Sequence, residues 1–444
     1  MSDSAMKVSI FKGGVHPAHS KRATESVAIT KFPPPQKAVI PLQQHIGAPC
    51  EAKVKPGDKV KIGQKIGDSE SFVSVPIHAS ISGEVESVGP YNHPLGKQVE
   101  AVTIASDGAD SWNDDIKPVG ELEDLSPEKL REVIREAGIV GMGGATFPAH
   151  VKLKPPEEKP IDTVIINGAE CEPYLTGDHR LMVERPEDII YGLKIMMKAL
   201  EAENGVIGIE KNKPDAIKTM QELVKDETHI KVAPLPTKYP QGAEKMLIYS
   251  ITKREVPSGG LPLDVGVVNH NVGTAIAMTE ALREGKPLVE RVLTVTGSGI
   301  KQPANLKIRI GTLVKDVLEV QGWHEETTRK LIIGGPMMGL SQTSVDVPVI
   351  RGTSGILALT DEEVNLGESV DCINCGKCVD VCPVYLVPTF IAKAADRQMV
   401  ERAERFNALD CIECGCCAFG CPAGIPLTLK IKEAKAQINE KRKS

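Results

Sequence analysis

The sequence has few aromatic residues, no long apolar run and no excess of basic charge. Aromatic side chains make up 3% of the 444 residues, so few are available to stack on nucleic-acid bases. The net charge is −6, from 53 basic and 59 acidic residues, which argues against a general nucleic-acid-binding protein. No apolar run approaches the roughly 20 residues that cross a bilayer, and the first residues lack the apolar core of a secretory signal. We therefore expect a chain without a transmembrane segment, either soluble or peripheral to a membrane.

Most of the 11 cysteines form two matching runs near the C-terminus. Each run has the spacing C-x₂-C-x₂-C-x₃-C-P, which is the bacterial ferredoxin pattern for iron–sulfur ligation. The first run consists of Cys372, Cys375, Cys378 and Cys382, and the second run consists of Cys411, Cys414, Cys417 and Cys421. Because closely spaced thiolates turn toward one centre, two runs predict two 4Fe–4S clusters. The fourth cysteine of such a run usually ligates the other cluster. We therefore pair the first three cysteines of the first run with Cys421, and those of the second run with Cys382.

A zinc ribbon or a set of disulfides is the alternative interpretation of these cysteines. A single C-x₂-C pair would leave that alternative open, but the duplicated pattern favours iron–sulfur ligation. Cys416 is an additional cysteine inside the second run, whereas Cys50 and Cys171 stand alone. Clusters and free thiols are typical of a reducing cytoplasm.

The length predicts several domains. After an N-terminal extension over residues 1–35, residues 36–105 contain short strands separated by turns such as Pro56-Gly57-Asp58. This segment resembles a lipoyl-type barrel-sandwich domain. The position of the carrier lysine holds Phe72, so we expect a scaffold or docking barrel and not a swinging arm.

The rest of the chain predicts three further folding units and a tail, so the fold class is multidomain α/β. Residues 120–285 alternate between strands and helices, which predicts a doubly wound α/β domain. Strands return over residues 286–350 around one helix, which suggests a β-grasp (SLBB-like) domain. The cysteine runs define a ferredoxin-like helical module with two clusters over residues 360–426. Residues 427–444 predict a basic helix that either faces solvent or contacts phospholipid or a partner.

A glycine-rich loop follows the first helix of the α/β region. It reads Gly141-Met-Gly143-Gly144-Ala145-Thr146-Phe147-Pro148 and precedes Lys152. Small residues let backbone N–H groups approach a phosphate, and a lysine supplies positive charge. A plain turn is the alternative, and the loop is not a G-x-G-x-x-G motif that opens a helix. The strand at residues 163–167 then ends in Asn167-Gly-Ala-Glu170-Cys-Glu172, where α/β sheets bind their ligands.

Together with Gln241–Lys245 and Asn269–Thr274, these segments resemble the flavin-carrying peripheral subunit of respiratory complex I. The resemblance implies that FMN is held near its phosphate by Gly141, Gly143, Gly144, Ala145 and Lys152. It also implies a cofactor-binding set on the flavin side, made of Asn167, Glu170, Asn271 and Thr274. The residues expected to contact and orient NADH are Phe147, Glu172 and Glu244, although both glutamates could instead be solvated surface residues. The chain departs from the complex I pattern at Thr146, where that pattern has glycine, and at Ala169, Ala243 and Lys245.

Over residues 11–426 the order of segments resembles the C subunit of the Rnf complex. The N-terminal Phe11-Lys-Gly-Gly14 segment, the barrel without its lysine, the Gly334–Gly339 loop and the two cysteine runs carry this resemblance. It implies a peripheral subunit at the cytoplasmic face of a membrane-bound, ion-translocating ferredoxin:NAD oxidoreductase. Its implied partners are the other subunits and, through one of them, ferredoxin. NAD(H) would be the substrate, and FMN would accept two electrons together and release them singly to the clusters.

Two other functions are considered. A flavin/iron–sulfur cobalamin reductase has a barrel-like segment that follows its cluster module, whereas the barrel of this chain precedes the flavin-type domain. An electron carrier without flavin would show clusters but no flavin absorbance. Histidines such as His179 and His324 lack the spacing of a metal site, and we interpret them as structural.

Overall fold

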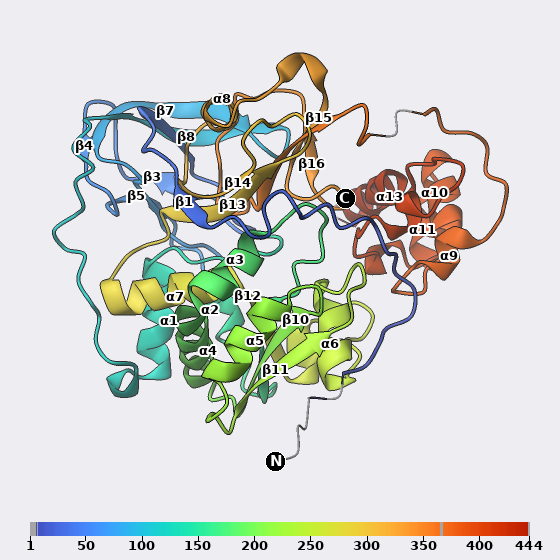
Figure 1. The fold of residues 1–444 in the computed structure, drawn as a ribbon, viewed down its shortest axis with the longest axis horizontal. Coiled ribbons are helices and arrows are strands. Elements are labelled where there is room, and N and C mark those ends of the chain that lie inside the picture. The colour runs from blue at the N-terminus through green and yellow to red at the C-terminus, as the bar shows by residue number, and fades with distance from the viewer. Residues whose placement is uncertain (1–5, 7, 365–366, 443–444) are drawn as a thin grey trace.

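The computed structural model describes residues 6, 8–364 and 367–442. Residues 1–5, 7, 365–366 and 443–444, which include the ends of the predicted N-terminal extension and basic helix, lie outside the described residues. Figure 1 shows a blue β-barrel, a green α/β domain, a yellow-to-orange sheet and a red helical module set to one side. In the described part of the chain, none of the helices is long and apolar enough to cross a membrane.

The N-terminal barrel consists of two facing antiparallel sheets. The strands are β2 (Lys37–Pro41), β3 (Glu51–Ala52), β4 (Lys59–Val60), β5 (Lys65–Asp68), β6 (Ile77–His78), β7 (Gly83–His93) and β8 (Lys97–Ser106). Their orders in the two sheets are β2-β8-β7-β4 and β3-β5-β6. Ile40, Ile66, Ile77 and Ile104 belong to the core between the sheets and are fully buried there.

The hairpin tip of the barrel carries Phe72 and lies against the α/β domain. The Phe72 ring meets the His150 ring edge-on at 5.8 Å between centroids, and the Lys154 ammonium group lies 5.7 Å from the Phe72 centroid. The position that would carry a lipoyl lysine is therefore a contact between two domains.

The α/β domain is built on a parallel sheet. Its strands are β9 (Thr163–Gly168), β10 (Asn204–Glu210), β11 (Ile230–Leu235) and β12 (Val267–Asn271), in the order β11-β10-β9-β12. The helices are η1 (Leu122–Asp124), α1 (Pro127–Glu136), α2 (Ala149–Lys152), α3 (Gly177–Glu184), α4 (Pro186–Leu200), α5 (Pro214–Leu223), α6 (Glu244–Thr252), η2 (Pro262–Val265) and α7 (Val272–Glu284). Helices α4, α5 and α7 contribute to the core on one face of the sheet, and α6 packs on the other. Helix α1 begins directly after Ser126, whose side chain accepts a hydrogen bond from the Lys129 amide and caps the helix.

The third unit is a mixed six-stranded sheet. Its elements are β1 (Ile29–Lys31), β13 (Glu290–Thr296), β14 (Ala304–Arg309), α8 (Val314–Val320), η3 (Glu325–Thr327), β15 (Thr328–Ile333), β16 (Leu340–Gln342) and β17 (Gly355–Thr360). The strand order is β1-β14-β13-β17-β15-β16. Two of these strands lie outside the residues 286–350 predicted for this unit: β1 pairs in parallel with β14, and β17 pairs with β13 and β15. A strand as short as β1 has no periodicity of its own, so only the backbone pairing reveals it.

The helical module carries both cysteine runs. Its helices are α9 (Lys377–Asp380), α10 (Pro388–Asp396), α11 (Val400–Arg405), η4 (Ala408–Asp410), α12 (Cys416–Phe419) and α13 (Leu427–Lys441). Helix α13 buries Leu427, Ile431 and Ile438 in the core of the module. Basic residues at and near this helix pair with acidic residues of the same module, including Lys430 with Asp396 and Arg442 with Glu404.

Candidate functional site

The glycine-rich loop forms a closed turn with an accessible backbone. The Gly141 amide donates to the Phe147 carbonyl over 2.9 Å and closes the loop. Gly143, Gly144 and Ala145 are exposed, and a Cβ added at Gly144 would meet no atom within 4 Å. Backbone N–H groups of this part of the loop are therefore open to a ligand. Thr146 has φ of +54°, in the left-handed region, which explains why the complex I pattern uses glycine at this position.

The loop rests on the N-terminus of α7. The Asn271 side chain accepts a hydrogen bond from the Gly273 amide over 2.8 Å and caps the helix. The Thr274 hydroxyl accepts from the Met142 amide over 3.0 Å. A Cβ at Gly143 would lie 2.9 Å from the Cβ of Asn271, so the contact requires glycine. The loop and the helix N-terminus together favour an anion, because unpaired N–H groups and the helix dipole both carry partial positive charge.

Lys152 lies at the end of α2 and joins three elements. Its ammonium group donates to the Glu244 carboxylate over 3.0 Å. It also donates to the backbone carbonyl of Asn269 over 2.8 Å and to the Asn269 side chain over 3.2 Å. The sequence-predicted phosphate lysine and one predicted NADH-contacting residue therefore form an ion pair beside β12.

The polar side chains at the end of β9 bind different partners. Asn167 donates to the Gly242 carbonyl over 2.9 Å, and its position pairs with Asn271 in the neighbouring strand. Glu170 accepts from the amides of Asp178 and His179 at 2.7 and 3.2 Å and so holds the start of α3. Asn167, Asn271 and Thr274 thus gather near the glycine loop, whereas the Glu170 carboxylate is occupied by a helix N-terminus.

Glu172 is held by the Gly334–Gly339 loop of the third unit. Its carboxylate accepts hydrogen bonds from the amides of Met337 at 3.0 Å and Met338 at 2.8 Å. Burial raises the pKa of this carboxyl to about 7, although the two amide hydrogen bonds act in the opposite direction. The Gly334–Gly339 loop therefore connects to the end of β9 through a half-buried acidic group.

Two neighbouring residues were missed in the sequence. His270 lies between two asparagines of the Asn269–Thr274 segment, and both of its buried ring nitrogens lack a hydrogen-bond partner among the described residues. Burial lowers the pKa of this imidazole well below its usual value. Asp178 accepts from the Asn271 side chain at 2.6 Å, and burial raises the pKa of its carboxyl. The sequence could have pointed to His270, because this residue lies inside the Asn269–Thr274 motif. It could not have pointed to Asp178, which lies in a helix without any such motif.

These observations fit a phosphate-bearing flavin. The open glycine backbone and the α7 N-terminus suit an anionic group. Lys152 adds a positive charge, and the unpartnered His270 is a polar group that a bound ligand could satisfy. The residues present are therefore complementary to FMN in charge and in hydrogen bonding.

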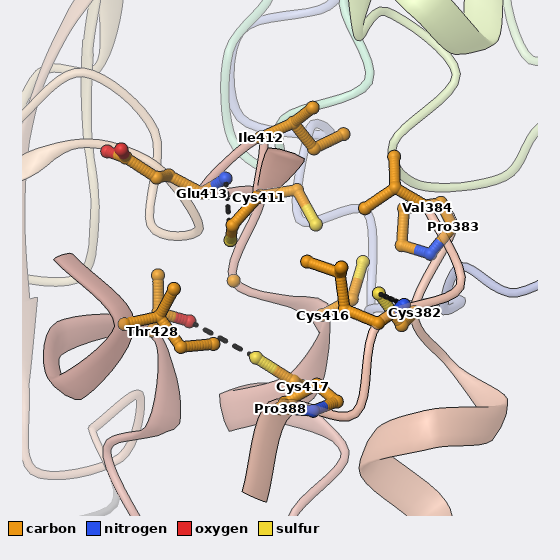
Figure 2. Close-up of a pocket in the computed structure, with 14 residues that line it drawn as sticks. Cys382, Pro383, Val384, Pro388, Cys411, Ile412, Glu413, Cys416, Cys417 and Thr428 are labelled. Carbon is orange, nitrogen blue, oxygen red and sulfur yellow. Dashed lines mark hydrogen bonds between the residues drawn. The ribbon is translucent and has the colours of Figure 1, made fainter. Parts of the chain in front are cut away.

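A second site is a pocket in the helical module. Four cysteines of the predicted second-run cluster line it, namely Cys382, Cys411, Cys414 and Cys417. Figure 2 shows Cys382, Cys411 and Cys417 on different sides of the pocket, together with the extra Cys416. Burial raises the pKa of Cys411 to about 11 and that of Cys417 to about 12, although hydrogen bonds from the Glu413 amide and with the Thr428 hydroxyl act in the opposite direction. Apolar residues such as Ile412 and Ile431 complete the walls. This donor set of soft thiols in an apolar wall fits an iron–sulfur cluster.

The thiols of the proposed first-run cluster differ in exposure, from exposed to buried. Cys375 is exposed and Cys372 is half-buried, with its sulfur 3.7 Å from the Thr389 hydroxyl. Burial raises the pKa of the Cys378 thiol, and the nearby thiolates of Cys372 and Cys421 add to this shift. Cys421 is thus a neighbour of the first run and does not line the second-run pocket formed by the described residues.

Three family models match the chain. Residues 9–109 match the RnfC barrel sandwich hybrid domain, residues 134–280 match the Nuo51 FMN-binding domain, and residues 366–422 match a 4Fe–4S dicluster domain. The predicted barrel, flavin-binding domain and cluster domain are therefore confirmed.

Curated relatives match most of the chain. The C subunit of the proton-translocating ferredoxin:NAD(+) oxidoreductase complex of Clostridium ljungdahlii is 49% identical over 90% of this chain and 87% of that protein. The C subunit of the Na(+)-translocating complex of Acetobacterium woodii is 48% identical over 91% of each chain. The C subunit of an ion-translocating oxidoreductase complex of Rhodobacter capsulatus is 45% identical over 85% of this chain and 73% of that protein.

Proposed function

The chain belongs to the family of C subunits of ion-translocating ferredoxin:NAD⁺ oxidoreductase complexes of the Rnf type, and we propose that it exchanges electrons between NAD(H) and the rest of such a complex. A single observation carries this function. One polypeptide contains a flavin-binding domain with an anion-binding loop and, beside it, a module with two sets of cluster thiols. FMN supplies the conversion between a two-electron hydride donor and one-electron clusters. The cobalamin-reductase alternative is not favoured by these relatives.

The phosphate end of the flavin is proposed to lie on the glycine loop. Gly141, Gly143, Gly144 and Ala145 would present backbone N–H groups there, and the N-terminus of α7 would add its dipole. Lys152 would neutralise phosphate charge while it keeps its contact with Asn269. Asn167, Asn271 and Thr274 would fix the ring side of the cofactor, and Glu170 would act by holding α3 in place.

The nicotinamide contacts are proposed to come from Phe147, Glu172 and Glu244. Phe147 closes the glycine loop and is only half-buried, so its ring is available to stack on a planar ligand. Glu244 lies beside Lys152 and could accept hydrogen bonds from a ribose. A direct contact from Glu172 would compete with two backbone hydrogen bonds. Hydride transfer needs orientation of the two rings, so these residues would act by positioning.

The clusters are proposed to have crossed ligation. Cys411, Cys414, Cys417 and Cys382 would hold the second-run cluster, which is supported by the pocket that they line. The first-run cluster would use the remaining thiols, namely Cys372, Cys375, Cys378 and Cys421.

We also infer a β-grasp core in the third unit, because the order β14-β13-β17-β15 places two antiparallel pairs around a parallel central pair. The cluster module would be ferredoxin-like.

The protein is proposed to bind other subunits of the complex at the cytoplasmic face of the membrane. Ferredoxin would exchange electrons with this chain through one of those subunits.

The decisive experiment is anaerobic reconstitution of the full chain with iron, sulfide and FMN, followed by addition of NADH. We expect about eight irons, one FMN and NADH-dependent bleaching of both chromophores. Fewer than about four irons, or clusters without flavin binding, would reject the proposal.

A further inference from the structure

We propose that residues 11–15, here called the N-terminal clamp, hold the second-run cluster against the flavin-binding domain, so that this cluster and not the first-run cluster exchanges electrons with the flavin. The inference rests on the proposed function and adds an order to its electron carriers. In Figure 1 the dark blue N-terminal segment runs between the red module and the α/β domain near α6. The clamp is thus placed to contact both.

On the module side, the clamp meets the end of the first run. The Gly14 amide donates to the Val381 carbonyl over 2.8 Å. A Cβ added at Gly13 would lie 2.7 Å from the carbonyl oxygen of Cys382, and Gly13 has φ of +71°. Cys382 lines the second-run pocket. The clamp therefore contacts the backbone of a proposed ligand, at a distance that only glycine permits.

On the domain side, the clamp pairs with the segment before α6. Val15 and Tyr239 exchange two backbone hydrogen bonds of 2.8 and 3.0 Å, as in an antiparallel bridge. The Lys238 ammonium group donates to the Phe11 carbonyl over 2.9 Å and lies 4.6 Å from the centroid of the Phe11 ring. Phe11 and Val15 are both buried. These contacts fix the clamp to the flavin-binding domain by backbone pairing as well as by side chains.

Tyr239 joins the two sides directly. Its backbone holds Val15, and its hydroxyl donates to the carbonyl oxygen of Cys414 over 2.7 Å. Only 2% of the Tyr239 surface is exposed. The next residue of the run, Gly415, lies against the Met337 carbonyl, which a Cβ would approach to 2.7 Å. Met337 in turn belongs to the loop that binds Glu172. The second-run pocket is thus enclosed by the clamp, the flavin-binding domain and the third unit.

The proposed ligands of the first-run cluster are less evenly covered, because Cys378 is buried but part of the run faces solvent. Cys375 is exposed, and the neighbouring Val370 and Ile373 are 62% and 66% exposed. Electron tunnelling weakens exponentially with distance. The second-run pocket contacts the flavin-binding domain through Tyr239, so its cluster would be the neighbour of the flavin, and the more exposed first-run cluster that of an external carrier. Two electrons arrive together as hydride from NADH. They would leave singly through the second-run and then the first-run cluster to a one-electron carrier of a partner subunit, and the one proton left from the hydride would pass to solvent.

The test uses the reconstituted full chain and compares Gly13→Ala with Gly96→Ala. Gly96 also has a positive φ, +74°, but a Cβ there meets no atom within 4 Å, so this control carries the backbone strain without the contact. Stopped-flow mixing with NADH separates the bleaching of flavin from the later reduction of the clusters. We expect Gly13→Ala to bleach flavin at the wild-type rate and to reduce its clusters severalfold more slowly, while Gly96→Ala behaves as wild type. Wild-type cluster reduction in Gly13→Ala would overturn the proposal.

A second variant tests whether slower cluster reduction in Gly13→Ala could result from simple misfolding. Tyr239→Phe removes only the hydroxyl that reaches Cys414. We expect full iron content, an altered electron paramagnetic resonance signal of the second-run cluster alone, and slower cluster reduction after normal flavin bleaching. Faster amide hydrogen exchange at Gly14 is expected in Gly13→Ala and not in Gly96→Ala. A change confined to the first-run signal would reject the assigned order. Absence of flavin bleaching in the wild type would instead reject the proposed function itself.

Discussion

The ammonium group of Lys152 lies 3.0 Å from a carboxylate oxygen of Glu244 and within hydrogen-bond distance of Asn269. This ion pair joins the residue proposed to neutralise the FMN phosphate to one proposed to contact NADH. Both residues are partly exposed, at 24% and 40% of their side-chain surfaces, so the pair by itself contributes little stability. The ion pair instead places a positive and a negative group beside the same strand, β12.

The first prediction concerns the positive member of this pair. Lys152→Ala should weaken FMN binding about 10- to 100-fold, because a hydrogen bond to a charged group contributes about 1.5–3 kcal/mol. Lys154→Ala is the matched control, since Lys154 lies over the Phe72 ring on the barrel side. Flavin fluorescence during titration of the apoprotein measures both dissociation constants. Equal effects of the two substitutions would contradict the assignment of Lys152.

The second prediction concerns Glu244. In Glu244→Gln the amide keeps a hydrogen-bonding group near Lys152 but removes the negative charge. We expect FMN content to stay at the wild-type level and the KM for NADH to rise, because the ribose contact weakens. Steady-state reduction of a one-electron dye, with NADH varied, gives KM and kcat separately. A loss of FMN with unchanged KM would show that Glu244 acts on the flavin site.

Several of these features could be predicted from local sequence. The cysteine spacing, the glycine loop and the strand at residues 163–167 are each contained in one short segment, so their chemistry is visible without the fold. The helix after Ser126 also carries its own cap and amphipathic face. Local patterns of this kind predicted the cluster domain and carried the resemblances that implied the barrel and the flavin-binding domain, and the family models match all three.

Other features depend on residues that are far apart in the sequence. Glu172 is held by Met337 and Met338 from another unit, so its burial could not be deduced from the acidic strand end alone. The pairing of β1 with β14 joins segments that are separated by the whole barrel and α/β domain. Likewise, the lysine-rich pattern of α13 gave no indication that Lys430 and Lys435 pair with Asp396 and Glu413.

The third prediction tests crossed ligation. Cys421→Ala should remove the cluster held mainly by the first run, and Cys382→Ala should remove the cluster held by the second run. Each variant should lose about four of the expected eight irons. Cys416→Ala is the control, because Cys416 lines the same pocket without belonging to the proposed ligand set. Iron analysis and electron paramagnetic resonance identify which signal disappears. Retention of both clusters in Cys382→Ala, with loss of one in Cys416→Ala, would reassign the ligand.

The fourth prediction follows from the pKa of Glu172, which burial raises to about 7 from its usual value of 4.5. Between these pH values the folded state binds more protons than the unfolded state, so this group lowers stability as pH rises. The loss amounts to about 3 kcal/mol by pH 8. Glu172→Gln removes this dependence, so its stability relative to wild type should increase as pH rises from 4.5 to 7. Thermal unfolding of the apoprotein at several pH values measures the difference, and a constant difference would exclude a raised pKa.

The last prediction compares how easily the two clusters are lost. The second-run pocket is walled by Ile412, Ile431 and Pro388, whereas Cys375 of the first run is exposed. A chelator with a mild oxidant reaches an exposed cluster first, because attack on the iron or sulfide requires contact. The first-run signal should therefore disappear before the second-run signal when both are followed by electron paramagnetic resonance. In Gly13→Ala the two signals should disappear closer together in time, because a displaced clamp opens the pocket beside Cys382. Loss of the second-run signal first in the wild type would contradict both the enclosure of that pocket and the order of electron carriers drawn from it.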